Sequence, residues 1–123
     1  MVPQFKQEDL FEALEQYDAK DFNDFDYGVV RMDRSGKIRA YNNYNSELAA
    51  DANKDVIGQN FFTQVAPCTN NFMVAEKYSQ FEKELDETLD YILTYRVKPA
   101  PVTLRMLAKS SSENQYLIIR LKN

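Results

Sequence analysis

The sequence predicts an α+β domain in which helices pack against an antiparallel sheet. The chain of 123 residues has the length of one domain, and no linker or repeat divides it. Apolar residues recur at helical spacing in two stretches, and they alternate with polar residues towards the C-terminus, as in strands. The resulting order is a helix, two strands, several short helices, a longer helix and three strands, which is typical of the α+β class.

The N-terminal part predicts one helix followed by a connector. Residues 8–17 carry apolar side chains three and four positions apart, so we expect an amphipathic helix there. Residues 18–26 are rich in acidic side chains, and we expect the two aromatic residues among them, Phe22 and Phe25, to point inward.

A β-hairpin is expected next. Residues 27–32 and 37–41 predict two strands. Between them, residues 33–36 predict a turn in which Gly36 can adopt a positive φ. Across residues 42–67, asparagines that favour caps and turns predict short, broken helices.

The second half predicts a longer helix and then three strands. Residues 72–86 are expected to be helical because their apolar residues repeat at intervals of four, three and four. Beyond this stretch the period becomes two. The residues expected to share strand faces are Tyr91, Leu93, Tyr95 and Val97 in the first strand and Val102, Leu104 and Met106 in the second, and residues 116–121 form the third.

Composition argues against several classes of function. The net charge is −4 and no basic cluster is present, so we expect no nucleic-acid binding. No stretch approaches the roughly 20 apolar residues of a membrane span, and the first residues lack an apolar signal region, so we expect a cytoplasmic protein without membrane contact. The chain has one cysteine and no histidine, which disfavours disulfides, the usual metal sites and enzymes with a Cys–His nucleophile.

One segment surrounds the single cysteine. Residues 56–69 are V-I-G-Q-N-F-F-T-Q-V-A-P-C-T, in which Cys68 is the thiol. This run closely resembles the segment around the chromophore cysteine of the photoactive yellow protein family, and weaker similarity extends over nearly the whole chain. The resemblance implies a PAS fold: a central five-stranded antiparallel sheet flanked by helices, with residues 1–26 as an N-terminal helical cap and residues 27–123 as the PAS core.

The family resemblance also implies a function. It implies a blue-light photoreceptor in which Cys68 carries p-coumaric acid (4-hydroxycinnamic acid) covalently as a thioester. Light isomerises the chromophore from trans to cis, and a conformational change follows. In the family a tyrosine and a glutamic acid hold the buried phenolate, and Tyr41 matches that tyrosine. The remaining residues expected to bind the chromophore are Val30, Asn45, Ala49, Asp51, Phe61, Phe62, Val65, Ala66, Thr69, Tyr91, Leu93 and Val97.

The chemistry of these residue types suits a buried phenolate. Such a charge is costly to bury without strong donors, and a tyrosine hydroxyl can donate a short, charge-assisted hydrogen bond. Phe61 and Phe62, with the small apolar residues after them, would exclude water. Simpler interpretations exist for each residue. A lone cysteine is commonly a small buried hydrophobe, and Tyr91 with Leu93 is typical of sheet packing.

The sequence departs from the family pattern at several positions. Asn45 stands where the family usually has its glutamic acid; its amide can donate a hydrogen bond but has no proton to release. We therefore expect reprotonation from water or another acid, a higher phenolate pKa and a smaller light-driven change. Ala49 replaces a supporting threonine, Asp51 replaces a shielding arginine, and Leu93 replaces a pocket phenylalanine. Val97 replaces a methionine linked to dark recovery, so we expect recovery to be slow.

Two alternatives stay open from the sequence. One is a PAS-like module that binds another ligand or a protein and has impaired or lost photochemistry. The other is a cysteine-nucleophile enzyme, which the absence of histidine disfavours. The expected partner is an unknown downstream signalling protein, with the cap as a candidate output surface, and the expected state is a monomer or weak dimer.

Overall fold

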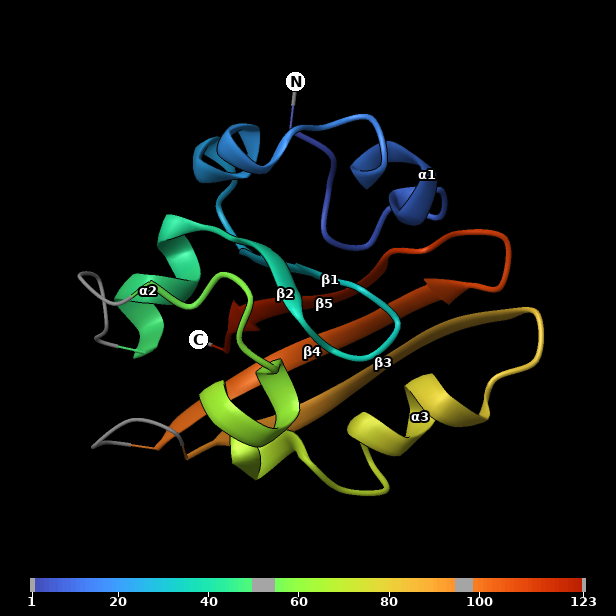
Figure 1. Cartoon of the computed structure of the whole chain (residues 1–123). Helices are drawn as coiled ribbons and strands as arrows, with labels where there is room; N and C mark the ends of the chain where they lie inside the picture. Colours follow the sequence, from blue (N-terminus) through green and yellow to red (C-terminus); the bar gives the residue numbers. More distant parts are fainter. Residues whose placement is uncertain (1, 50–54, 95–98, 123) are drawn as a thin grey trace.

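The computed structural model describes residues 2–49, 55–94 and 99–122. Five strands form one antiparallel sheet in the order β2-β1-β5-β4-β3 (Figure 1), which confirms the predicted fold class. The strands are β1 (Gly28–Met32), β2 (Ile38–Tyr41), β3 (Glu84–Leu93), β4 (Ala100–Lys109) and β5 (Gln115–Leu121).

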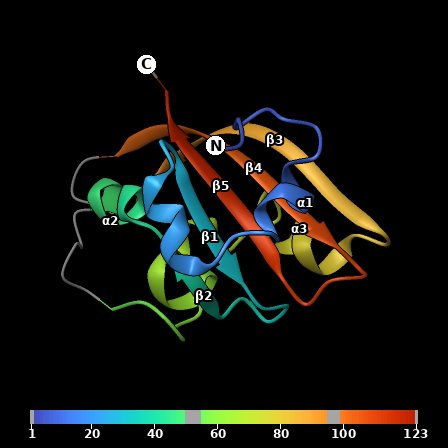
Figure 2. The ribbon, with the colours of Figure 1, turned by 90° about the horizontal axis from the view of Figure 1, so that it is seen from above.

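The helices are short and lie on both faces of the sheet. They are α1 (Leu10–Leu14), the 3₁₀ helix η1 (Ala19–Asp24), α2 (Asn43–Ala49), the π-helix η2 (Phe61–Val65), the 3₁₀ helix η3 (Pro67–Thr69) and α3 (Ala75–Gln80). The N-terminal segment with α1 and η1 covers one face, whereas η2 and α3 lie on the other (Figures 1 and 2). None of the helices among the described residues has the length and apolar character to cross a membrane.

Each face of the sheet has its own buried core, because successive strand residues point to opposite faces. The helix-side core contains Val30, Met32, Ile38, Leu48, Val56, Phe61, Phe62, Ala66, Val74, Tyr78, Leu85, Leu93, Ala100, Val102, Leu104, Met106, Ala108, Leu117 and Ile119. The cap-side core contains Phe5, Leu10, Phe11, Leu14, Phe22, Phe25, Tyr27, Val29, Ala40, Leu107, Tyr116 and Ile118. The inward placement expected for Phe22 and Phe25 is therefore confirmed.

The predicted hairpin is confirmed, and its turn is held by one aspartate. Asp33 Oδ1 accepts hydrogen bonds from the backbone N and the hydroxyl of Ser35, at 2.9 and 2.6 Å, and from Lys37 N at 3.0 Å. These bonds outweigh the effect of burial, which alone would raise the pKa, and the pKa of Asp33 is lowered. Gly36 has φ +95°, the conformation for which glycine was expected there.

The predicted helix over 72–86 is wrong in length. The helix α3 covers only Ala75–Gln80, and β3 begins at Glu84. Leu85 suits both periods, but it pairs with Ala108 in a ten-pair ladder between β3 and β4, and this pairing outweighs the helical propensity of its neighbours. The helix predicted over 8–17 is also shorter, since α1 ends at Leu14. The three C-terminal strands are confirmed, and Tyr91 and Leu93 share a face with Val102, Leu104 and Met106, as expected. Tyr95 and Val97 lie outside the described residues.

Two arginines of the sheet hold the N-terminal segment. Arg31 Nη2 donates to the carbonyl oxygens of Leu14 and Tyr17 at 2.9 and 2.7 Å. Arg105 Nη1 donates to the carbonyl oxygens of Phe5 and Gln7 at 2.8 and 2.7 Å. The cap is thus attached by hydrogen bonds to its main chain as well as by apolar packing.

Candidate functional site

The segment before Cys68 extends the hydrogen bonding of β2. Gly58 N donates to Ile38 O at 2.8 Å, and Ile38 N donates to Gln59 O at 2.9 Å. Phe61 N donates to Gly36 O at 2.9 Å. Gly58 has φ +87°, a conformation that side chains other than glycine rarely adopt. This part of the motif therefore fixes the segment to the sheet edge.

Asn60 then starts η2 and orients the two phenylalanines. Its side-chain oxygen accepts from Phe62 N and Thr63 N at 2.9 and 3.1 Å, as an N-cap does. Its Nδ2 donates to Ser35 O at 2.8 Å. A Cβ on Gly36 would lie 3.1 Å from Asn60 Nδ2, so glycine permits this close approach. The Gly-x-Asn-Phe-Phe pattern thus seats both rings in the helix-side core.

Cys68 lies in η3 with its main chain fixed and its side chain half-buried. Its carbonyl oxygen accepts from the Tyr91 hydroxyl at 2.6 Å and from Asn71 Nδ2 at 3.1 Å. Asn71 Nδ2 also donates to the Tyr91 hydroxyl at 2.6 Å. Thr69, which follows the cysteine, is buried, and its hydroxyl donates to Ala66 O at 2.7 Å. The thiol is free and packs against the helix-side core.

Most of the predicted site residues lie together on one face of the sheet. The helix-side core contains nine of them, namely Val30, Phe61, Phe62, Ala66 and Leu93 as buried members and Tyr41, Val65, Cys68 and Tyr91 packed against it. Asn45 is fully buried in α2. Ala49 is the last residue of α2, and its side chain, like Asp51 and Val97, lies outside the described residues.

Tyr41 ends β2 on the face of the helix-side core. It pairs with Val30 of β1 across the antiparallel ladder. Its ring is half-buried against the helix-side core, and its hydroxyl oxygen is inaccessible to solvent. Tyr41 ends the second strand, as the sequence predicted for residues 37–41.

Both hydrogens of the Asn45 side-chain amide form hydrogen bonds within the protein. Its Nδ2 donates to Val29 O at 2.9 Å and to Asn42 Oδ1 at 3.0 Å. Its Oδ1 is buried and accepts no hydrogen bond from the described part of the chain. This oxygen lies against Gly28, where an added Cβ would clash with it. The sequence suggested that the Asn45 amide could donate a hydrogen bond to a bound group. In the structure its nitrogen already donates to two protein oxygens, so it is not available as that donor.

Three residues that matter here were not identified as site residues from the sequence. Asn71 was not singled out, although an asparagine three residues after the cysteine is a signal for a loop cap. Asn42 was expected only to favour a cap, yet its spacing of three from Asn45 places the two amides in contact. Gly28 lies in the strand predicted over residues 27–32, and no local signal reveals the close approach that it permits.

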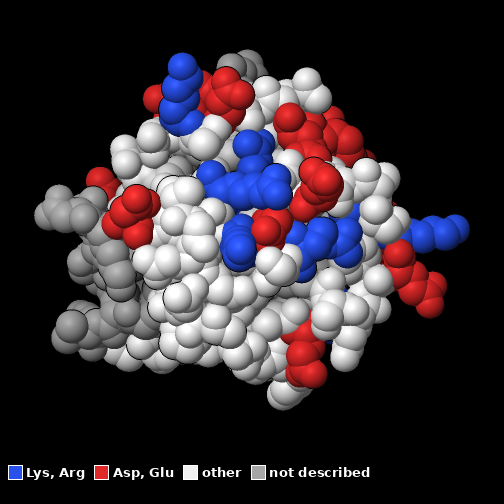
Figure 3. All heavy atoms as spheres, in the orientation of Figure 1, with Lys and Arg blue, Asp and Glu red and all other residues white. Residues whose placement is uncertain are grey.

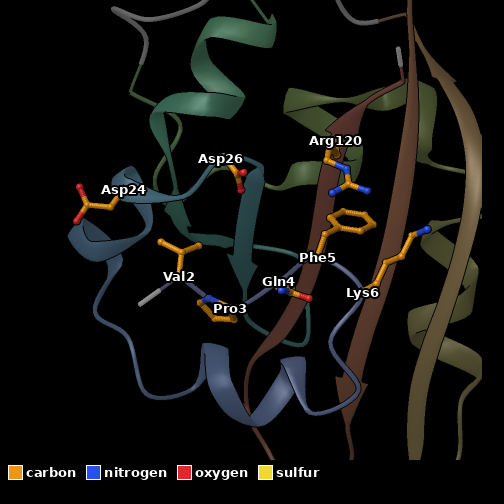
Figure 4. A pocket seen from close by; sticks show the side chains of 8 residues that line it. All are labelled: Val2, Pro3, Gln4, Phe5, Lys6, Asp24, Asp26 and Arg120. Atoms are coloured by element: carbon orange, nitrogen blue, oxygen red, sulfur yellow. The ribbon is translucent and has the colours of Figure 1, made fainter.

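A surface hollow of about 530 Å³ lies elsewhere, between the N-terminal segment and β5 (Figure 4). The Arg120 guanidinium lies over the Phe5 ring, 4.6 Å from its centroid. The hollow also contains Asp24 and Asp26, and Figure 3 shows acidic and basic side chains interspersed over the visible face of the molecule. Among the described residues, no predicted site residue lines this hollow, and Cys68 is not part of its lining.

Comparison with curated proteins finds relatives that share one name. No family model matches the chain. The chain is 26% identical over 118 residues to the photoactive yellow protein of Rhodothalassium salexigens, a match that covers 94% of each chain. It is 30% identical over 98 residues to the photoactive yellow protein of Rhodobacter capsulatus, covering 78% of this chain and 77% of that one.

Comparison with solved structures agrees with the relatives. The photoactive yellow protein domain from the sensor histidine kinase Ppr of Rhodospirillum centenum matches with a TM-score of 0.76 and 28% identity, over 89% of this chain and 97% of that one. The PAS domain of an HTR-like protein from Haloarcula marismortui matches with a TM-score of 0.64, 17% identity and coverage of 94% and 100%, and it supports the fold alone. The sheet order, the seating of Cys68 and these relatives together lead to one assignment: the chain belongs to the photoactive yellow protein family of PAS-fold proteins.

Proposed function

We propose that the protein is a blue-light photoreceptor that carries p-coumaric acid as a thioester on Cys68. The observation that carries the proposal is the position of Cys68, the only cysteine in the sequence. Its thiol is half-buried against the helix-side core, while Tyr91 and Asn71 hold its carbonyl oxygen. The names of the relatives support a light-sensing role.

The residues around the thiol suit a flat, mostly apolar group with one polar end. Phe61, Phe62 and Ala66 are buried and exclude water. The hydroxyl oxygen of Tyr41 and the Oδ1 of Asn45 are buried polar atoms, and Tyr41 packs against the same core as Cys68. When bound, p-coumaric acid supplies absorption of light and trans–cis isomerisation of its double bond. The side chains hold the sulfur, exclude solvent and offer hydrogen bonds to the polar end.

Attachment requires an activated form of the acid. The Cys68 sulfur attacks the acyl carbon of an activated ester or anhydride, so that the sulfur–carbon bond forms as the bond to the activating group breaks. The thiol proton passes to the buffer, and the activating group leaves with the electron pair of the broken bond. No oxidant or reductant is required.

The proposal is tested by loading the purified protein with the anhydride of p-coumaric acid. We expect one added acyl group on Cys68 by mass spectrometry and an absorption band that bleaches on illumination and returns in the dark. The Cys68→Ala variant is the matched control, because it reports acylation of lysines alone. A band that never bleaches favours a ligand-binding module with lost photochemistry. A protein that takes up no group on Cys68 contradicts the proposal.

We propose further that the cap communicates the light signal to a partner protein. Asn42 supports this, because its side chain joins the site to the cap: it accepts from Asn45 and donates to Phe22 O and Tyr27 O at 2.8 and 2.9 Å. Illumination of the loaded protein should then speed amide exchange in residues 2–26 more than in β4 and β5. Equal exchange in light and dark would contradict this role for the cap.

A further inference from the structure

The helix α3 is too short to be stable by itself, so its folding depends on contacts at its two ends. It contains six residues, Ala75–Gln80, whereas isolated helices shorter than about 12–15 residues are marginal in water. Tyr78 is its buried residue. The ion pair of Lys77 with Glu87, at 3.3 Å, is exposed and contributes little. The stability of α3 therefore comes from the residues that hold its first turn and from those that hold Tyr78.

One side chain joins the start of α3 to Cys68. Oδ1 of Asn71 accepts hydrogen bonds from Met73 N and Val74 N at 2.9 and 3.1 Å, and so holds the turn that leads into the helix. Nδ2 of the same side chain donates to Cys68 O at 3.1 Å and to the Tyr91 hydroxyl at 2.6 Å. A displacement of the Cys68 main chain therefore breaks hydrogen bonds of the amide that caps this turn.

Tyr78 fixes the helix itself to the sheet. This side chain is buried, and its hydroxyl donates to Tyr116 O in β5 at 2.7 Å. Burial raises the pKa of Tyr78 well above its usual value, so the hydroxyl stays a donor. The ring of Tyr78 lies 5.5 Å from the ring of Phe62 in η2. The segment around Cys68 thus reaches α3 twice, through Asn71 ahead of the helix and through Phe62 beside Tyr78.

We propose that α3 is a two-state element coupled to Cys68: it is folded while Asn71 holds the Cys68 carbonyl, and it opens when this contact is released. The inference rests on the proposed function for its trigger, which is movement of the group on Cys68. Opening α3 removes Tyr78 from β5 while the sheet stays paired. This response occurs on the face of the sheet opposite the cap, so it is separate from the response proposed for the cap. Because coupling is reciprocal, a change at Tyr78 also alters the exposure of the Cys68 thiol.

Amide exchange of the unloaded wild type tests whether α3 opens by itself. We expect the protection factors of the hydrogen-bonded amides in α3 to be about tenfold or more below those in the middle of β4 and β5. Equal protection in α3 and in these strands would mean that the helix opens only when the whole protein unfolds. That result overturns the inference, and it needs no variant.

Tyr78→Phe tests the coupling from the end of α3 that does not contact Cys68. Tyr27→Phe is the matched control, because Tyr27 is also buried and its hydroxyl also donates to a main-chain carbonyl, Pro3 O at 2.8 Å, but on the cap side. We expect Tyr78→Phe to speed alkylation of Cys68 by iodoacetamide about fivefold, the effect of losing one buried hydrogen bond. Tyr27→Phe should leave the rate within about twofold of wild type. Equal rates in the two variants overturn the inference, because alkylation then follows global stability alone.

Asn71→Ala tests the coupling from the other end. Asn70→Ala is the matched control, because this exposed neighbour makes its hydrogen bond through its main chain, from N to Pro67 O at 3.1 Å. We expect exchange in residues 75–80 to become about tenfold faster in Asn71→Ala and to change little in Asn70→Ala. If β4 and β5 become faster by the same factor as α3, Asn71 acts on global stability and the inference is overturned.

The loaded protein tests the trigger. If Cys68 takes up p-coumaric acid and the absorption band bleaches, illumination should speed amide exchange in α3 about tenfold over the dark protein. Bleaching without a change in α3 overturns the inference and leaves the proposed function intact. If Cys68 takes up no group, the proposed function fails, and the measurements on the unloaded protein still decide whether α3 is coupled to Cys68.

Discussion

Gly28 and Asn45 pack so closely that no methyl group fits between them. A Cβ at Gly28 would clash with Asn45 Oδ1 and would lie 3.3 Å from Ile119 O. Neither neighbour moves easily, because Nδ2 of Asn45 is held by two hydrogen bonds and Ile119 is part of β5. The absence of a side chain at Gly28 therefore allows the buried Asn45 amide to lie against β1.

Gly28→Ala should therefore destabilise the protein by about 1–3 kcal/mol, the cost typical of overpacking. The measurement is chemical denaturation of the unloaded protein. The double variant Gly28→Ala/Asn45→Ala is the matched control, because it removes the Asn45 amide with which the new methyl group clashes. Its loss of stability should be smaller than the sum of the losses in the two single variants. Strict additivity would show that the contact is not strained.

The Tyr91 hydroxyl is the other residue-scale feature, because it fixes the carbonyl next to the thiol. Tyr91→Phe removes the bond to Cys68 O and the acceptor for Asn71. We expect a loss of about 1 kcal/mol in stability and faster alkylation of the Cys68 thiol. Tyr44→Phe is the control, because that hydroxyl accepts from exposed Leu121 N and does not contact η3. Unchanged alkylation in Tyr91→Phe would mean that the hydroxyl does not order this loop.

At the scale of elements, one carboxylate joins the end of α1 to the β4–β5 turn. Glu15 accepts hydrogen bonds from the Ser112 hydroxyl at 2.6 Å, from Asn114 Nδ2 at 2.8 Å and from the Tyr116 hydroxyl. Burial works to raise the pKa of Glu15, but these bonds, with the charge of Arg31, outweigh it and hold the pKa below 4.5. Burial and the bond to Glu15 raise the pKa of Tyr116, so its hydroxyl stays a donor.

This lowered pKa makes the docking of α1 sensitive to acid. A carboxyl group with a lowered folded-state pKa adds stability above its unfolded pKa of 4.5, and this stability disappears as the pH falls through the folded value. Glu15→Gln should therefore flatten the fall in unfolding free energy between about pH 5 and pH 3. Glu12→Gln is the control, because Glu12 is exposed and forms an ion pair with Lys109. Parallel pH profiles for wild type and Glu15→Gln would contradict this role.

At the scale of the whole molecule, the sheet separates two cores, and Arg105 links its cap-side face to the N-terminus. Its guanidinium pairs with Asp86 through two 2.9 Å bonds and also donates to Phe5 O and Gln7 O. The Arg105 side chain is 6% exposed, so its charge depends on these partners. The division into a cap of residues 1–26 and a core of residues 27–123 stays a prediction.

Arg105→Met should cost about 2–4 kcal/mol, because it leaves two cap carbonyls without their donor while keeping most of the volume. Amide exchange in residues 5–14 should rise more than exchange in β4. Lys77→Met is the matched control: it breaks the exposed pair with Glu87 and should change stability by about 1 kcal/mol or less. Equal losses in the two variants would mean that the buried guanidinium does not hold the cap.

The sequence by itself determined the fold class and the hairpin. The turn at Gly36 and the alternation of apolar residues in β3 and in the first half of β4 depend on local chemistry, so the sequence alone reveals them. The motif around Cys68 similarly carried enough specific residues to identify the family. Its glycine and its Asn60 cap act within a few residues of their own position.

Only the tertiary structure decided where α3 stops and which way Asn45 points. Leu85 fits helix and strand equally well, and its pairing with Ala108, 23 positions away, selects the strand. An asparagine presents a donor on one side and an acceptor on the other, and the sequence does not say which faces the site. Asn42, Val29 and Gly28 come together only in the folded chain, and they leave the oxygen facing inward. Long-range partners decide such features because the local alternatives are nearly equal in energy.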